Sequence, residues 1–274
     1  MANRLPCALL LAYDGSAFRG WQRQPGMPTI QEAIERALGE SLDRKVQIFG
    51  AARTDAGVHA QGQVCHFVKE AVATEAAVEQ LSASLRSLLP SSVTVRAASL
   101  AHPSFHARSS AIGKSYRYRF SWGAPISMES RDAFQLGPTA MPDWSRARAA
   151  LEEMSKLDAL PGLSSPSTDR RPAPPLAQWN IAIDSADATR CALSVAGPAF
   201  RKHQVRNLAG HLAAIALGLA EPDSLARLAA RARPWMGACA PPHGLTLMRV
   251  DYPRELDPFG LLSSACSDAG EKIR

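Results

Sequence analysis

Apolar side chains recur along the chain at two spacings, and these predict strands and helices in turn. Residues 5–13 are almost continuously apolar and end at the turn residues Asp14-Gly15-Ser16, as expected of a strand. Thr29 and Glu32 then form a capping-box pattern, which marks the start of a helix. The apolar residues that follow at helical spacing are Ile30, Ile34, Leu38 and Leu42. We therefore expect a strand followed by a helix.

The rest of the first half continues this alternation. Residues 46–50 and 62–68 are rich in β-branched and aromatic side chains and predict two strands. A helical stripe runs from Val78 to Leu88, and residues 93–97 alternate between apolar and small or polar positions, as in a strand. The first half is thus predicted to be a β-α-β-β-α-β unit.

The second half repeats the alternation more loosely and shows no internal sequence repeat. Its predicted strands are residues 114–122, 192–196 and 245–252, and its predicted helices are 144–154 and 208–219. Residues 164–175 contain four prolines and three serines, which predicts a loop. Arg170 and Arg171 in this loop either contact phosphate or belong to a solvated surface.

Composition sets broad limits. The 274 residues are 46% hydrophobic and carry a net charge of +6, which suits a polyanionic partner without requiring one. Five cysteines without a CxxC pair favour reduced thiols, and the first residues are unlike a signal peptide. No segment approaches the length of about 20 apolar residues needed to span a membrane. We expect a cytoplasmic protein of one or two domains with no membrane contact.

A polar run without hydrophobic period, residues 51–60, lies between the strands predicted at 46–50 and 62–68. It brings together Arg53, Asp55, Gly57 and His59, so it is predicted to be a functional loop held by the two strands. Taken alone, Asp55 is also explained as a turn aspartate that hydrogen-bonds its own backbone, since Asp-x-Gly turns are frequent.

The run Arg53-Thr54-Asp55-Ala56-Gly57-Val58-His59, followed by Gln61-Gly62-Gln63-Val64, resembles the catalytic loop of the tRNA pseudouridine synthase A family. Other segments resemble the family in the same order along the chain. They are Tyr13-Asp14-Gly15-Ser16, Gly20-Trp21-Gln22-Arg23-Gln24, Phe105-His106-Ala107-Arg108, Lys114-Ser115-Tyr116-Arg117-Tyr118, His203 with Val205-Arg206-Asn207, and Gly244-Leu245 before Val250-Asp251-Tyr252.

This resemblance implies an isomerase that converts uridine to pseudouridine at positions 38–40 of the tRNA anticodon arm. It assigns Asp55 as the catalytic aspartate, which either attacks C1′ or removes the 2′ proton. Arg206 is implied to pair with Asp55 and to lower its pKa, although a surface helix arginine or a phosphate contact also fits the residue. Tyr116 matches the active-site tyrosine, whereas Tyr118 on the same strand face fits a core tyrosine better.

The resemblance also implies RNA contacts. Arg53 would fill the gap left by a flipped base, and Leu245 would form an apolar wall of the uracil pocket. The segment Phe105, His106, Ala107 and Arg108 would contact RNA, with Arg108 on phosphate and His106 on a sugar or base edge.

The family further implies an α/β (α+β) fold of two ferredoxin-like domains with mixed or antiparallel sheets, joined around a central basic cleft. The predicted domains are residues 1–103 and 104–254, followed by a tail, 255–274, that has no periodicity. The family works as a homodimer without a cofactor. We also expect no metal, because Pro103 interrupts the one close histidine pair, His102 and His106.

The chain departs from the family pattern at Ala52, Arg86, Arg201 and Gln204 and in residues 158–165. These departures leave the expected chemistry intact and open the question of the substrate. A divergent paralogue acting on another RNA or on a free uridine derivative remains an alternative. So does a non-catalytic RNA-binding module or tRNA chaperone, although the presence of Arg53, Asp55, Tyr116 and Arg206 argues against it.

Overall fold

The computed structural model describes residues 5–68, 74–123, 132–167, 175, 180–231, 235, 237 and 239–260. Within these ranges the chain forms nine strands and five α-helices. This content confirms the predicted mixed α/β class. None of the helices in these ranges has both the length and the apolar character needed to cross a bilayer.

The chain divides into two compact units, Met1–Lys114 with Leu247–Arg274 (unit 1) and Ser115–Thr246 (unit 2). The predicted domain boundaries at residues 103 and 254 stay a prediction.

Unit 1 contains an antiparallel sheet in which β1 (Pro6–Tyr13) lies between two other strands. β3 (His59–Val68) pairs with one edge of β1, and β4 (Val93–Leu100) pairs with the other. The short β2 (Phe49–Gly50) pairs with β3, and β9 (Leu245–Asp251) follows β3 in the strand order. Nearly all of β1 is buried, which explains why its sequence is a continuous apolar run and does not alternate.

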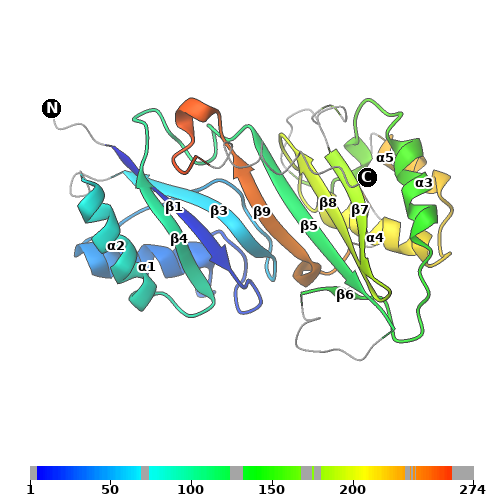
Figure 1. The fold of residues 1–274 in the computed structure, drawn as a ribbon, viewed down its shortest axis with the longest axis horizontal. Helices are drawn as coiled ribbons and strands as arrows, with labels where there is room; N and C mark the ends of the chain where they lie inside the picture. Colours follow the sequence, from blue (N-terminus) through cyan, green and yellow to red (C-terminus); the bar gives the residue numbers. More distant parts are fainter. Residues whose placement is uncertain are drawn as a thin grey trace, which may run out of the picture. The chain divides into compact units, whose positions relative to one another are not determined.

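Unit 1 has two helices, of which the first begins where the capping-box pattern predicts and the second contains the predicted apolar stripe from Val78 to Leu88. The Thr29 hydroxyl accepts a hydrogen bond from the Glu32 amide at 3.3 Å and so caps α1 (Ile30–Leu42). Thr74 caps α2 (Glu75–Leu88) in the same way. Helix α2 packs against β4, and α1 packs against α2 (Figure 1).

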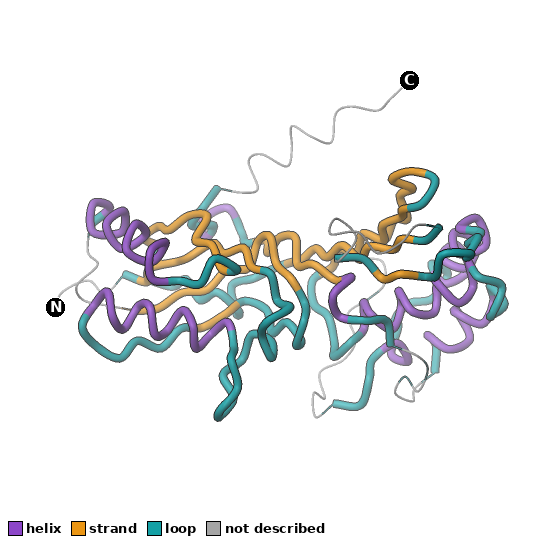
Figure 2. Tube along the Cα trace, turned by 90° about the horizontal axis from the view of Figure 1, so that it is seen from below, coloured by secondary structure: helices purple, strands orange, loops and turns teal. Residues whose placement is uncertain are grey.

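Unit 2 contains a second set of strands and three helices. The strand order is β5 (Gly113–Ser121), β8 (Arg190–Gly197) and β7 (Asn180–Asp187), with the short β6 (Phe134–Gln135) parallel to β5. Helix α3 (Trp144–Met154) contacts both α4 (Gln204–Ala216) and α5 (Asp223–Ala229). In Figure 2 these three helices form one group beside the strands of this unit.

Several elements differ from the prediction. Strand β7 and helix α5 were not predicted, because β7 mixes small and polar residues with only two isoleucines and α5 spans only seven residues. Helix α4 begins at Gln204 and not at residue 208, so its first turn includes Arg206. Strand β3 begins at His59, which shortens the functional loop to residues 51–58. In the predicted tail, Arg254–Leu256 form a 3-10 turn and residues 261–274 lie outside the described ranges.

Candidate active site

The loop between β2 and β3 carries Arg53 and Asp55 among residues that are mostly buried. Arg53 is exposed and Asp55 is partly exposed, whereas Ala52, Thr54 and Val58 are buried. The Val58 amide donates a hydrogen bond to the Asp55 carbonyl at 3.1 Å, and Gly57 within this turn has a positive φ of 78°. The buried residues of the loop thus anchor it, while Arg53 is exposed and Asp55 partly exposed.

A buried polar network ties this loop to the sheet. Gln63 on β3 is 0% exposed, and its amide accepts from the Ala52 N–H at 3.1 Å and donates to the Ala52 carbonyl at 2.8 Å. Gln63 also donates to the Tyr13 hydroxyl at 3.4 Å, which in turn lies 2.8 Å from the Thr54 hydroxyl. Because buried polar groups without partners are costly, this network favours a single loop conformation.

Two glycines allow other backbone segments to approach the loop closely. Gly20 has a φ of +92°, and a Cβ at this position would lie 2.8 Å from the Thr54 carbonyl oxygen. A Cβ on Gly15 would overlap the Val58 carbonyl, while the Gly15 amide donates to Nδ1 of His59 at 3.2 Å. The segment after β1 therefore packs directly behind the loop that carries Asp55.

The segment Phe105 to Arg108, also in unit 1, is held in place by a histidine. Phe105 and Ala107 are buried, His106 is partly exposed and Arg108 is exposed. Nδ1 of the buried His66 accepts a hydrogen bond from the Ala107 amide at 3.2 Å. Burial lowers the pKa of His66 to about 4, the charge of His106 acts in the same direction, and a hydrogen bond with the Phe49 backbone opposes both. His66 is therefore neutral at pH 7 and can accept this bond.

The two tyrosines on β5 have different environments. Tyr118 is 0% exposed, and its hydroxyl donates to the Pro241 carbonyl at 2.8 Å. Burial raises the pKa of Tyr118, and the charge of Arg206 opposes this rise. Tyr116 is partly exposed, and its ring packs edge-on against Phe200 with centroids 5.0 Å apart. Tyr118 is thus a core tyrosine, and Tyr116 is the one with an accessible ring.

Arg206 lies in the first turn of α4 and is anchored to the segment that precedes β9. Its Nε donates to the Ala240 carbonyl at 2.9 Å, and the Ala240 amide donates to the Arg206 carbonyl at 3.2 Å. His203 at the start of this helix adopts a φ of +60°. The side chain of Gln204, at one of the positions that depart from the family pattern, is buried and donates to the Leu160 carbonyl at 3.3 Å. Its polar group is thereby satisfied within the protein.

The predicted site residues therefore fall into two groups. Arg53, Asp55 and the 105–108 segment belong to unit 1, whereas Tyr116, Arg206 and the buried Leu245 belong to unit 2. Arg170 and Arg171 lie outside the described residues. Within the described ranges, no three or more His, Cys, Asp or Glu side chains gather in a way that could hold a metal ion.

Sequence reasoning gave no supporting role to Gln63 or His66. Both are polar residues within residues 62–68, a segment that otherwise contains only glycine and apolar side chains, and this is the signal that could have identified them. A polar side chain at such a position needs a hydrogen-bond partner, and in each case the partner is the backbone of a predicted functional segment.

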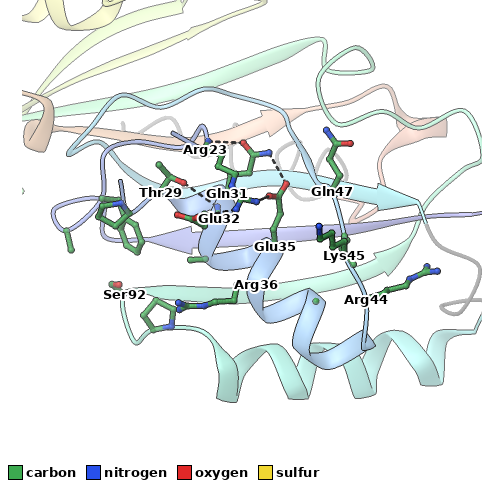
Figure 3. A pocket seen from close by; sticks show the side chains of 17 residues that line it. Arg23, Thr29, Gln31, Glu32, Glu35, Arg36, Arg44, Lys45, Gln47 and Ser92 are labelled. Atoms are coloured by element: carbon green, nitrogen blue, oxygen red, sulfur yellow. Dashed lines mark hydrogen bonds and ion pairs between the residues drawn. The ribbon is translucent and has the colours of Figure 1, made fainter. Parts of the chain in front are cut away.

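A separate hollow of about 1080 Å³ lies in unit 1 beside α1, and Figure 3 shows the side chains around it. None of the predicted site residues lines it. Its charges are partly paired, because the guanidinium nitrogens of Arg23 lie 3.3 Å from a carboxylate oxygen of Glu32 and 3.3 Å from one of Glu35. Arg36, Arg44 and Lys45 also line the hollow, so its surface combines both signs of charge. This mixture gives it no clear preference for an anionic or a cationic ligand.

Comparison with known proteins identifies related sequences. A family profile described as tRNA pseudouridine synthase matches residues 10–108 and 168–253, ranges that include Asp55 and Arg206 but not Tyr116. A tRNA pseudouridine synthase A from Methylococcus capsulatus is 37% identical over 264 residues, which cover 94% of this chain and 92% of the relative. Proteins of the same name from Rhodopseudomonas palustris and Sinorhizobium fredii are 34% and 35% identical, over 91% and 89% of this chain and 100% and 98% of their own.

Proposed function

Because the chain belongs to the tRNA pseudouridine synthase family, we propose that it is an isomerase that converts uridine in tRNA to pseudouridine. In this reaction the bond between N1 and C1′ breaks and a bond between C5 and C1′ forms. The C5 proton is lost and N1 gains one, so nothing is oxidised and no group is added. The observation that carries the proposal is the partly exposed Asp55, held on a loop in which Ala52 is bonded by the buried Gln63 and Thr54 by the buried Tyr13.

Asp55 is proposed to act at the sugar. Its carboxylate either attacks C1′ or removes the 2′ proton, and both routes need it close to the ribose and ionised. The turn closed by the Val58 amide leaves Asp55 partly exposed, which suits either role. A rigid loop matters because a displacement of about 1 Å can cost roughly 10²-fold in rate.

Arg206 and Tyr116 are proposed to complete the catalytic group. Arg206 would pair with Asp55 and keep it ionised, and its anchoring to Ala240 limits how far its guanidinium can move. Tyr116 would stack on the target uracil and lie where the C5 proton leaves, and its accessible ring supports this assignment over Tyr118.

The remaining residues are proposed to bind and open the RNA. A stacked base must flip out, which costs a few kcal/mol, and the exposed guanidinium of Arg53 can fill the gap. His106 and Arg108 carry the accessible surface of their segment, while the buried Phe105 and Ala107 would position them. Leu245 would line the uracil pocket. Arg170 and Arg171 are proposed to contact phosphate.

Several finer features are proposed from the family. The target would be uridine at positions 38–40 in the anticodon arm, the enzyme would be a cytoplasmic homodimer, and the reaction would need no cofactor. The net charge of +6 supports an RNA substrate, since it favours association with a polyanion.

The test is tritium release from C5-labelled uridine in bulk tRNA that lacks pseudouridine. The wild type is compared with Asp55→Ala, Asp55→Asn and, as a control, Asp223→Asn, because Asp223 is an exposed aspartate that pairs with Arg227 on α5. We expect release by the wild type and the control, and a loss of roughly 10³-fold or more in both Asp55 variants.

The other outcomes separate the alternatives. Absence of release from tRNA by the wild type would contradict the proposal, and release from labelled free nucleotides would then favour a small-molecule enzyme. RNA binding without any release would favour the non-catalytic RNA-binding module. Release that persists in both Asp55 variants would remove Asp55 from the catalytic group. Mapping the modified uridines by primer extension would test positions 38–40.

A further inference from the structure

An exposed aromatic cluster in unit 1 lies beside the predicted RNA-contacting segment. Phe49 on β2 is 41% exposed, and its ring stacks on His66 with centroids 5.3 Å apart and an interplanar angle of 28°. The ring of His106 lies 5.5 Å from Phe49 and 4.7 Å from His66. Phe49, His66 and His106 thus form one group, of which Phe49 and His106 are accessible.

Strand pairing and further ring contacts fix the positions of the rings in this cluster. Phe49 and His66 are directly opposite each other in the pairing of β2 with β3. His66 in turn meets Phe105 edge-on at 5.8 Å, and Phe105 packs against Tyr252 at 5.1 Å. An exposed ring that is already ordered loses little conformational entropy when a ligand stacks on it, which favours binding.

His106 adds a hydrogen-bond donor to this surface. Its Nδ1 accepts from the backbone amides of Arg108 and Ser109 at 3.1 and 3.3 Å. Nδ1 is therefore unprotonated in the neutral ring, and the proton is on Nε2. The ring face can stack on a base, and the N–H donor can bond a base edge or a sugar. The neighbouring cationic side chain of Arg108 can bind a phosphate.

We propose that Phe49, together with His106, forms a stacking surface for an unpaired nucleobase of the RNA substrate. The assignment rests on the proposed function, because it takes the ligand to be RNA. Stacking of a base on an aromatic side chain is tolerant of sequence, so this surface would contribute affinity and register and not the choice of base. It would hold a nucleotide other than the uridine that reacts at Asp55.

The experiment measures the Kd of pseudouridine-free tRNA by filter binding at several salt concentrations. Phe49→Leu should weaken binding about tenfold, whereas Phe49→Trp should bind at least as well as the wild type. Val68→Ala is the control, since Val68 is an apolar residue of the same unit that is 52% exposed and carries no ring. Phe49→Leu should leave the slope of log Kd against log salt unchanged, whereas Arg108→Ala should reduce it by about 0.7 to 0.9.

Wild-type affinity in Phe49→Leu, or equal weakening in the Leu and Trp variants, would overturn the proposal. Wild-type RNA affinity together with a shift toward monomer in sedimentation would assign Phe49 to a contact between copies of the chain, and would overturn it as well. Tritium release by the wild type separates this result from failure of the proposed function. Unchanged binding by Phe49→Leu with an active wild type rejects only the stacking surface, while an inactive wild type rejects the isomerase and leaves the Kd comparison valid.

Discussion

The side-chain amide of Gln63 forms hydrogen bonds with both backbone polar groups of Ala52, at 3.1 Å to its amide nitrogen and 2.8 Å to its carbonyl oxygen. Ala52 lies three residues before Asp55, and Gln63 is on the strand that follows the loop. This side chain therefore takes the place of the strand partner that the loop backbone lacks.

Replacing Gln63 should damage both stability and turnover. In Gln63→Leu the two backbone groups of Ala52 stay buried without a partner, which should lower the free energy of unfolding by about 2 to 4 kcal/mol. A looser loop should also lower kcat more than it changes KM, because Asp55 is displaced while distant RNA contacts remain. Urea unfolding and tritium-release kinetics measure the two effects. Gln47→Leu, at an exposed glutamine, should cost less than about 0.5 kcal/mol, and an equal loss in both variants would contradict this account.

Substitutions at two glycines with positive φ should separate the effect of a steric clash with the loop from the effect of backbone strain. Gly20→Ala and Gly26→Ala both place a Cβ on left-handed backbone, at φ values of +92° and +68°. Only Gly20 faces the loop, since its Cβ would lie 2.8 Å from the Thr54 oxygen, whereas nothing lies within 4 Å of Gly26. We expect Gly26→Ala to cost about 1 kcal/mol with normal activity, and Gly20→Ala to cost more and to lower kcat. Thermal unfolding and turnover check this pair, and normal kcat in Gly20→Ala would show that the loop tolerates the added methyl group.

The two tyrosines of β5 should separate catalysis from stability. Tyr118→Phe removes the 2.8 Å hydrogen bond to the Pro241 carbonyl and should lower the free energy of unfolding by about 1 kcal/mol. Tyr116→Phe should change stability by less than about 0.5 kcal/mol, but if its phenol receives the C5 proton, kcat should fall by roughly 10²-fold. Urea unfolding and single-turnover rates test both variants. The reverse pattern would make Tyr118 the functional residue.

The buried His66 should make the stability of the protein depend on pH. Its pKa is lowered from the ordinary 6.5 to about 4 in the folded chain, so between these values the unfolded chain binds a proton that the folded chain does not. Its contribution to the free energy of unfolding is therefore complete above pH 6.5 and is lost as the pH falls toward 4. In His66→Asn the amide oxygen can still accept from the Ala107 amide but does not titrate, so the fall should be smaller. Urea unfolding at a series of pH values compares the two proteins, and parallel profiles would contradict the assignment to His66.

Local pattern was sufficient for most elements and for the candidate loop. The cap and apolar stripe of α1, the apolar stripe of α2 and the apolar run of β1 are set by neighbouring residues, so the local pattern predicts them. The loop with Asp55 was recognisable because polar residues without a period interrupt two strand patterns. Strand β7 and helix α5 were missed because β7 gains its order from pairing with β8 and α5 from packing against α3.

The sequence by itself determined the family, the mixed α/β class and the residues that are candidates for the chemistry. Only the tertiary structure decided which polar residues support them, because Gln63 and His66 find partners 11 and 41 residues away. It also showed that Tyr118 is fully buried and Tyr116 partly exposed, a difference in burial for which the sequence had only favoured Tyr118 as the core tyrosine. Hydrogen bonding and burial depend on which distant segments meet, and the spacing of residues along a chain does not contain that information.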